Sequence, residues 1–114
     1  MPKRILNPID CTVDYAFQRI GGKYKGRIIW YLHYKKILRY GELRRTVKGI
    51  TAKMLTQTLR ELEADNLIVR KVFYEVPPRV EYMLTETGRE LIPFIIHLNA
   101  WGAKQMNEKN LAKV

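Results

Sequence analysis

Cationic, amide and hydroxyl side chains recur at helical spacing just before the middle of the chain. If residues 51–66 form a helix, one face is apolar, made of Ala52, Leu55, Leu59 and Leu62. The opposite face carries Lys53, Gln57 and Arg60. An amide can pair with the edge of adenine in a DNA major groove, and Lys or Arg can reach guanine or phosphate. This face therefore has the residue types for reading a nucleic acid.

The positive charge of the chain is concentrated in one segment. The 114 residues include 21 Lys+Arg and 11 Asp+Glu, a formal net charge of +10. Residues 23–53 hold ten cations and a single acid, Glu42, a net charge of +9, whereas the other 83 residues hold 11 cations and 10 acids. This concentration favours a polyanionic partner over an ordinary solvated surface. Composition alone leaves DNA, RNA and an anionic membrane open.

The sequence gives little support for disulfide bonding, metal binding or catalysis. One cysteine, Cys11, and two distant histidines, His33 and His97, predict neither a disulfide framework nor a metal site. We find no catalytic triad motif, no paired carboxylates in an apolar setting and no phosphate-binding glycine loop, so we expect no enzyme and no cofactor.

The sequence also indicates where in the cell the protein is located. There is no signal-peptide pattern, and the longest apolar stretch, residues 91–98, is too short to span a bilayer. The apolar helix faces are needed for the core, which disfavours a membrane-surface binder. We expect a cytoplasmic, nucleoid-associated protein with no membrane partner.

The elements that must position these residues can be read from periodicity and from breaker residues. Thr51 is a good N-cap for the helix over 51–66, and Gly49 suits the turn before it. Alternating β-branched and aromatic residues over 67–84, interrupted by Pro77-Pro78, predict a β-hairpin. Further helices are expected at residues 10–20, 23–36, 42–48 and 86–108, all within one domain spanning 1–114.

The last predicted helix carries more apolar surface than one small core can cover. Its apolar residues lie on several faces, and Pro93 should kink it or delay its regular part. A second copy of the chain is the expected cover. We assign four residues to this dimer interface: Leu91, Ile95, Leu98 and Trp101.

The order of elements predicts an α+β, mostly helical fold, a winged helix-turn-helix with a β-hairpin wing and further helices at both ends of the chain. The helix-turn-helix spans about 42–66, the wing about 67–84, and the terminal helices about 10–20 and 86–108. In this arrangement the second helix enters a major groove, the first crosses the backbone and the wing lies beside them. The candidate DNA-binding residues are Arg44, Arg45, Thr51, Ala52, Lys53, Thr56, Gln57, Arg60 and Arg79. Arg79 is expected at the hairpin tip, beside the minor groove or the backbone.

Four stretches resemble the HxlR-type transcriptional regulators of the broader MarR-related class. They are CTVDYAFQRIGGKYK (11–25), YGELRRTVKGIT (40–51), KMLTQTLRELEADNLIVR (53–70) and YEVPPRVEYMLTETG (74–88), followed by Trp101-Gly102. The resemblance implies a homodimer on a near-palindromic operator. In that dimer the N- and C-terminal helices, about 10–20 and 86–108, are the dimerisation helices. Tyr24 departs from the family pattern, which favours Trp after Gly-Gly-Lys.

Several alternatives stay open at this stage. Cys11 near the start of the first helix is either a small buried residue of the dimer interface or a redox or electrophile sensor. The sensor role follows from the resemblance, because some members of that family sense thiol-reactive signals through a cysteine in this region. A small-molecule effector is a further partner to consider, as is a structural RNA- or ribosome-associated role in place of operator binding. Repression and activation are equally compatible with the sequence.

Overall fold

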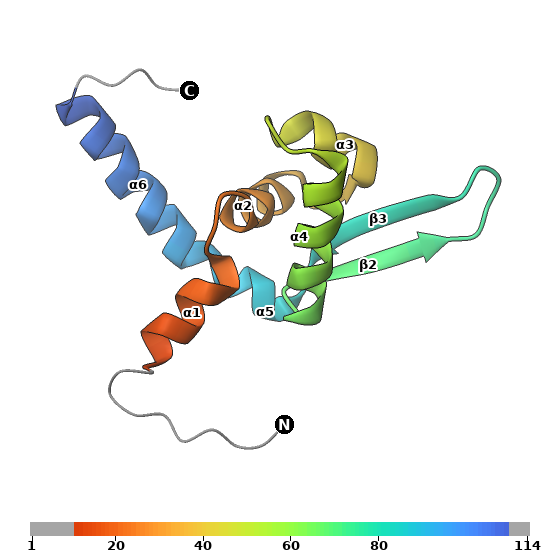
Figure 1. Cartoon of the computed structure of the whole chain (residues 1–114), viewed down its shortest axis with the longest axis horizontal. Coiled ribbons are helices and arrows are strands. Elements are labelled where there is room, and N and C mark those ends of the chain that lie inside the picture. The colour runs from red at the N-terminus through yellow and green to blue at the C-terminus, as the bar shows by residue number, and fades with distance from the viewer. Residues whose placement is uncertain (1–10, 110–114) are drawn as a thin grey trace.

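The computed structural model describes residues 11–109 of the chain (Figure 1). The elements in this part are α1 (Thr12–Ile20), α2 (Lys25–Lys35), β1 (Leu38–Arg39), α3 (Tyr40–Thr46), α4 (Ala52–Ala64), β2 (Ile68–Phe73), β3 (Arg79–Leu84), α5 (Glu86–Arg89) and α6 (Ile92–Glu108). The predicted fold class, α+β and mostly helical with a hairpin wing, is confirmed. None of the helices in the described part is long and apolar enough to cross a membrane.

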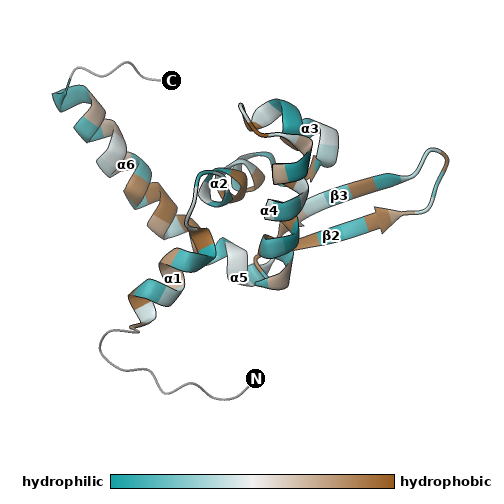
Figure 2. Ribbon diagram, in the orientation of Figure 1, coloured by the Kyte–Doolittle hydropathy of each residue, from teal (hydrophilic) through white to brown (hydrophobic). Residues whose placement is uncertain are grey.

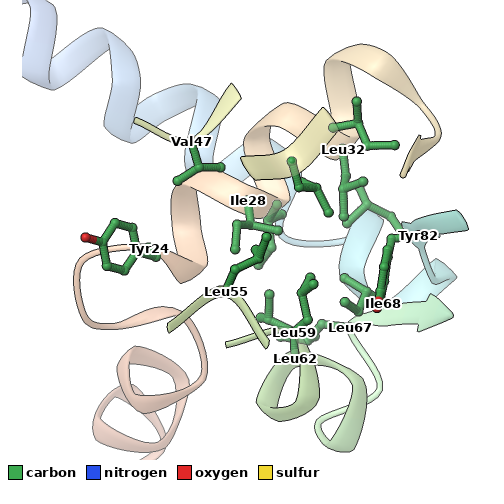
Figure 3. Packing of buried hydrophobic residues seen from close by; sticks show 14 of the residues in the cluster. Tyr24, Ile28, Leu32, Val47, Leu55, Leu59, Leu62, Leu67, Ile68 and Tyr82 are labelled. Carbon is green, nitrogen blue, oxygen red and sulfur yellow. The ribbon is translucent and has the colours of Figure 1, made fainter. Parts of the chain in front are cut away.

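The core lies where α2, α3 and α4 meet the base of the sheet. Figure 3 shows aliphatic side chains from these elements converging on one cluster. Its fully buried members include Ile28 and Ile29 of α2, Leu43 of α3, and Leu55 and Leu62 of α4. The apolar face predicted for residues 51–66 is therefore the face that α4 packs inward.

The three strands form an antiparallel sheet in the order β1-β3-β2. The hairpin β2–β3 projects away from the helices, as Figure 1 shows, and pairs Val72 with Val80. Its base is buried through Ile68 and Leu84, whereas Val76 in the tip is fully exposed. β1 is too short to be recognised from the sequence, and it pairs Leu38 with Tyr82 of β3.

Local signals placed the start of α4 correctly. The side chain of Thr51 accepts a hydrogen bond from the Met54 backbone N–H at 3.1 Å, as expected of an N-cap. Gly49 has a φ of 87°, which a residue with a side chain rarely adopts, so the glycine closes the turn between α3 and α4. The helix ends at Ala64, two residues before the predicted end.

The single helix predicted over 86–108 is wrong, because the segment forms two helices. Thr85 caps the short α5 by accepting from the Gly88 backbone N–H at 2.9 Å. Pro93 lies in the first turn of α6, where its missing N–H is not needed. The expectation that Pro93 delays the regular part of the helix is confirmed.

α1 and α6 extend from one side of the body (Figure 1), and Figure 2 shows apolar residues along both helices. Some of these are exposed, among them Phe17 of α1 and Leu98 and Trp101 of α6. α1 begins at Thr12 after Cys11 as N-cap, and position 10, where the helix was expected to start, lies outside the described residues. None of the nine residues of α1 is buried. The ring centroids of Phe17 and Phe94 lie 6.3 Å apart in an edge-to-face arrangement. This contact joins α1 to the start of α6.

Candidate nucleic-acid interface

α4 presents one polar face to solvent while its leucine face is buried. Lys53, Gln57 and Arg60 are exposed, as the sequence analysis predicted. Together with Ala52 and Thr56 they line one open hollow on the helix surface. The structure therefore brings five of the predicted site residues onto a single surface.

The N-terminus of α4 adds a partial positive charge to this surface. First-turn N–H groups of a helix have no intrahelical acceptor. The Thr51 side chain accepts a hydrogen bond from the Met54 N–H, and the first helical residues, Ala52 and Lys53, are exposed. Helix ends of this kind suit a phosphate group.

Tyr40 fixes the position of α4 against α3, a role that the sequence analysis missed. Its hydroxyl donates to the Ala52 carbonyl oxygen at 3.0 Å and lies 3.0 Å from the Thr56 Oγ1 atom. Thr56 is half-buried and its hydroxyl is engaged with Tyr40, so it contributes mainly to the orientation of the helix. No local pattern marks a tyrosine that acts across this turn.

The turn between α3 and α4 is also held from α2. The Tyr24 hydroxyl donates a hydrogen bond to the Gly49 carbonyl oxygen at 3.2 Å. The Arg27 guanidinium donates to the Lys48 carbonyl oxygen, also at 3.2 Å. The Tyr24 hydroxyl thus supplies a hydrogen bond at the position where the resembled family favours Trp. Both contacts restrain the chain directly before α4 and its exposed polar face.

Two acidic side chains of the α4 region are paired with cations from the preceding helices. Lys25 Nζ lies 3.1 Å from Glu61 Oε1, and Arg19 Nε lies 3.6 Å from Asp65 Oδ1. Gln57 Nε2 also donates to Glu61 Oε2 at 2.7 Å. Donation from Gln57, followed by the contact with Lys25, lowers the pKa of Glu61 below its usual value. Pairing leaves less negative charge to oppose a phosphate backbone.

α3 contributes further cations beside this surface. Arg44 and Arg45 are both exposed in its last turn. Glu42, the one acid of the basic segment, accepts from the Arg39 backbone N–H at 2.8 Å at the start of the same helix. The carboxylate therefore serves the helix N-terminus, as the sequence suggested.

Arg79 is not located at the hairpin tip, where it was expected. It is the first residue of β3, and its guanidinium contacts Glu75 at 2.7 Å and Glu81 at 3.0 Å. The same group lies 4.0 Å from the centroid of the Phe73 ring. Arg79 thus clamps the wing, and the glutamates that flank it in sequence were the available signal. On β2, Arg70 and Lys71 are exposed cations.

The fold and this surface define a winged helix-turn-helix protein: α3, a glycine turn, α4 with its polar face exposed, and the β2–β3 wing. The family model described as HxlR-like helix-turn-helix matches residues 19–110. The chain belongs to this family. It is a transcriptional regulator with the helix-turn-helix DNA-binding fold and not an enzyme.

Named relatives agree with this assignment. The regulatory protein MalR of Fusobacterium mortiferum is 47% identical over 96 residues, which cover 84% of this chain and 91% of MalR. The HTH-type transcriptional regulator YybR of Bacillus subtilis (strain 168) is 45% identical over 96 residues, 84% of this chain and 76% of YybR. The redox regulator HypR in its reduced form superposes with a TM-score of 0.82 and 40% identity, covering 88% of this chain and 98% of HypR.

Replacing Tyr40 by Phe tests the contact between α3 and α4. The variant loses the hydroxyl that bonds Ala52 and Thr56, so we expect the free energy of unfolding to fall by about 1 kcal/mol. Urea unfolding at 25 °C measures this change. Tyr34→Phe is the control, because Tyr34 is 70% exposed and its loss of a hydroxyl should change little. Equal midpoints for the two variants would contradict the positioning role.

Proposed function

We propose that the chain is a sequence-specific, double-stranded DNA-binding regulator that binds a near-palindromic operator as a homodimer. The observation that carries the proposal is the exposed face of α4, with Lys53, Gln57 and Arg60 on it. A helix of this kind fits the major groove, where all four base pairs can be distinguished. Such a protein acts on DNA in the cytoplasm, at the nucleoid.

Each group of residues has a distinct role in this proposal. Gln57 pairs with adenine, and Lys53 and Arg60 reach guanine or phosphate. Arg44 and Arg45 anchor the backbone from α3, since the first helix of the motif crosses it. The exposed N-terminus of α4 at Thr51 and Ala52 receives a phosphate. Arg79 supports the wing, and Arg70 and Lys71 are its proposed phosphate contacts.

Alanine variants should separate anchoring from base reading. Arg44→Ala or Arg45→Ala should weaken binding to all duplexes alike and lower the log–log salt slope by roughly 0.9 per half-site for each lost phosphate contact. Gln57→Ala should cost on the order of 1–3 kcal/mol on the operator and little on random DNA. Fluorescence anisotropy at several salt concentrations measures both effects, on an operator obtained by selection from genomic fragments.

Two comparisons make this test decisive. Lys104→Ala removes one exposed cation from α6 and should leave both affinity and salt slope nearly unchanged. Stronger binding to RNA hairpins than to duplex DNA would contradict the proposal and favour an RNA-associated role. Equal losses for the arginine and glutamine variants on both DNAs would show that the roles are assigned wrongly.

Support for the homodimer comes from the apolar surface of α1 and α6. Leu98 and Trp101 of α6 are exposed, as is Phe17 of α1. Ile95, expected in the interface, is buried in the core of its own chain, and Leu91 is half-buried against that core. The proposed interface therefore rests on Leu98 and Trp101 together with the exposed face of α1. Burying such a patch against its copy is the ordinary way to cover it.

Light scattering tests the assembly. The protein should have about twice the 13.5 kDa mass of one chain. Trp101→Glu should shift it to the monomer, because a carboxylate would be buried in the interface. Tyr74→Glu is the matched control, since Tyr74 is an exposed aromatic on the wing and its replacement should leave the dimer intact. A monomeric wild type at micromolar concentration would contradict the homodimer and the palindromic operator.

We further propose that Cys11 makes operator binding sensitive to thiol-reactive compounds. Cys11 is exposed and occupies the N-cap of α1, beside the proposed dimer surface. A relative of similar fold, HypR, is a redox regulator. A bulky or polar adduct at this point would disturb the dimer and thereby the spacing of the two recognition helices.

The comparison of wild type with Cys11→Ser tests this sensitivity. Operator affinity of the wild type should change at least several-fold after diamide or an aldehyde, and the variant should not respond. The chain has one cysteine, so a disulfide would need the second subunit or a small thiol. Non-reducing electrophoresis distinguishes these two products. Identical responses of the two proteins would return Cys11 to a structural role.

A further inference from the structure

We infer that Glu61, held by Lys25 of α2, orients the Gln57 amide so that it selects adenine over guanine. The inference rests on the proposed DNA-binding function and deepens it. Glu61 and Lys25 act here as positioning residues, because they reach the DNA base only through Gln57. No signal from the sequence alone joins the three side chains, since Lys25 comes from a different helix.

The contacts leave the amide one chemically sensible orientation. Gln57 Nε2 lies 2.7 Å from Glu61 Oε2, and the other carboxylate oxygen, Oε1, lies 3.1 Å from Lys25 Nζ. An ionised carboxylate only accepts hydrogen bonds, so the amide nitrogen must face it. A flipped amide would place two oxygen atoms against each other. The carbonyl oxygen of Gln57 therefore points away from Glu61.

Lys25 keeps the carboxylate in place. Its side chain is only 16% exposed, and α2 is fixed in the core through Ile28 and Ile29. Glu61 lies four residues after Gln57 on α4, the spacing at which side chains of a helix are neighbours. The lowered pKa of Glu61 agrees with a carboxylate that stays ionised, and so remains an acceptor, at neutral pH.

The fixed orientation changes what Gln57 can offer to a base. A free amide has two N–H donors and one carbonyl acceptor. With one N–H committed to Glu61, one donor and one acceptor remain. Adenine presents the matching pair in the major groove, the N7 acceptor and the N6 amino donor.

Guanine is rejected by the same arrangement. Its major-groove edge presents two acceptors, N7 and O6. A mobile amide could turn both of its N–H groups toward this edge. The amide held by Glu61 cannot, because its carbonyl oxygen would oppose O6. Glu61 thus removes the one binding mode that would make Gln57 tolerant of guanine.

The experiment measures base preference and not affinity alone. Selection from a randomised duplex library, performed with wild type and Gln57→Ala, identifies the base pair whose preference depends on Gln57. Affinities are then measured for two duplexes that carry adenine or guanine at that position. Wild type should prefer adenine by on the order of tenfold or more, and Glu61→Ala should lose most of that preference.

Conservative and double variants separate positioning from charge. Glu61→Gln keeps an acceptor oxygen and should retain part of the adenine preference. Lys25→Met keeps the aliphatic stem and should lose part of it. In a Gln57→Ala background, Glu61→Ala should leave the ratio of the two affinities unchanged, because the variants act through one interaction.

Glu63→Ala is the matched charge control, since Glu63 is exposed on the same helix and has no described contact with Gln57. It should raise affinity for both duplexes by the same factor. The inference is overturned if Glu61→Ala does likewise with an unchanged ratio, or if the Gln57-dependent position prefers guanine in the wild type. Both results leave the proposed operator binding standing, although a guanine preference would also contradict the pairing of Gln57 with adenine. Failure of the wild type to bind any duplex overturns both the inference and the proposed function. Circular dichroism and urea unfolding confirm that each variant is folded.

Discussion

The packing of one face of α4 against α2 and the sheet is the constraint on which the rest of the structure depends. Leu55 and Leu62 are fully buried and Leu59 nearly so, which commits this face to the core. Truncating such a leucine to alanine typically costs about 2–5 kcal/mol, a large part of the stability of a small domain. Because the helix cannot rotate without exposing these residues, the opposite face must stay in solvent. The polar surface of α4 is thus a consequence of core packing.

Polar contacts fix the orientation of α4, which apolar burial alone does not determine. The leucine face sets which side of α4 points outward, but burial has no directional preference that would fix the angle of the helix. Tyr40 supplies direction from α3 through Ala52 and Thr56, and Tyr24, the N-cap of α2, supplies it through Gly49. Hydrogen bonds require defined distances and angles, so these contacts hold the turn and the helix in one arrangement. A surface that discriminates base pairs needs this rigidity.

The charged side chains fall into two groups, those that form ion pairs and those that remain exposed. Acids near α4 and on the wing pair with cations, as in Lys25 with Glu61 and Arg79 with Glu75. Exposed cations such as Arg44 and Lys53 are left to face solvent. Most ion pairs of this kind add little to stability, because solvent screens partly exposed groups. In the proposed function their main effect is on recognition, since they determine which charges and which amide orientation the DNA meets.

The sequence by itself determined the features that depend on neighbouring residues. The spacing of Leu55, Leu59 and Leu62, the cap at Thr51 and the turn at Gly49 act within a few residues, and each was predicted correctly. The basic segment over 23–53 likewise required only counting.

Only the tertiary structure decided the rest, because contacts between residues distant in the chain depend on how the elements pack. The burial of Ile95, the hydrogen bonds of Tyr40 and the pairing of Lys25 with Glu61 all join different elements. The displacement of Arg79 from the hairpin tip follows from the strand register, which pairs it with Phe73. Periodicity states which side of a helix or strand a residue occupies. It does not state which side chain of another element lies opposite, and that partner decides whether a cation or an amide remains available to a ligand.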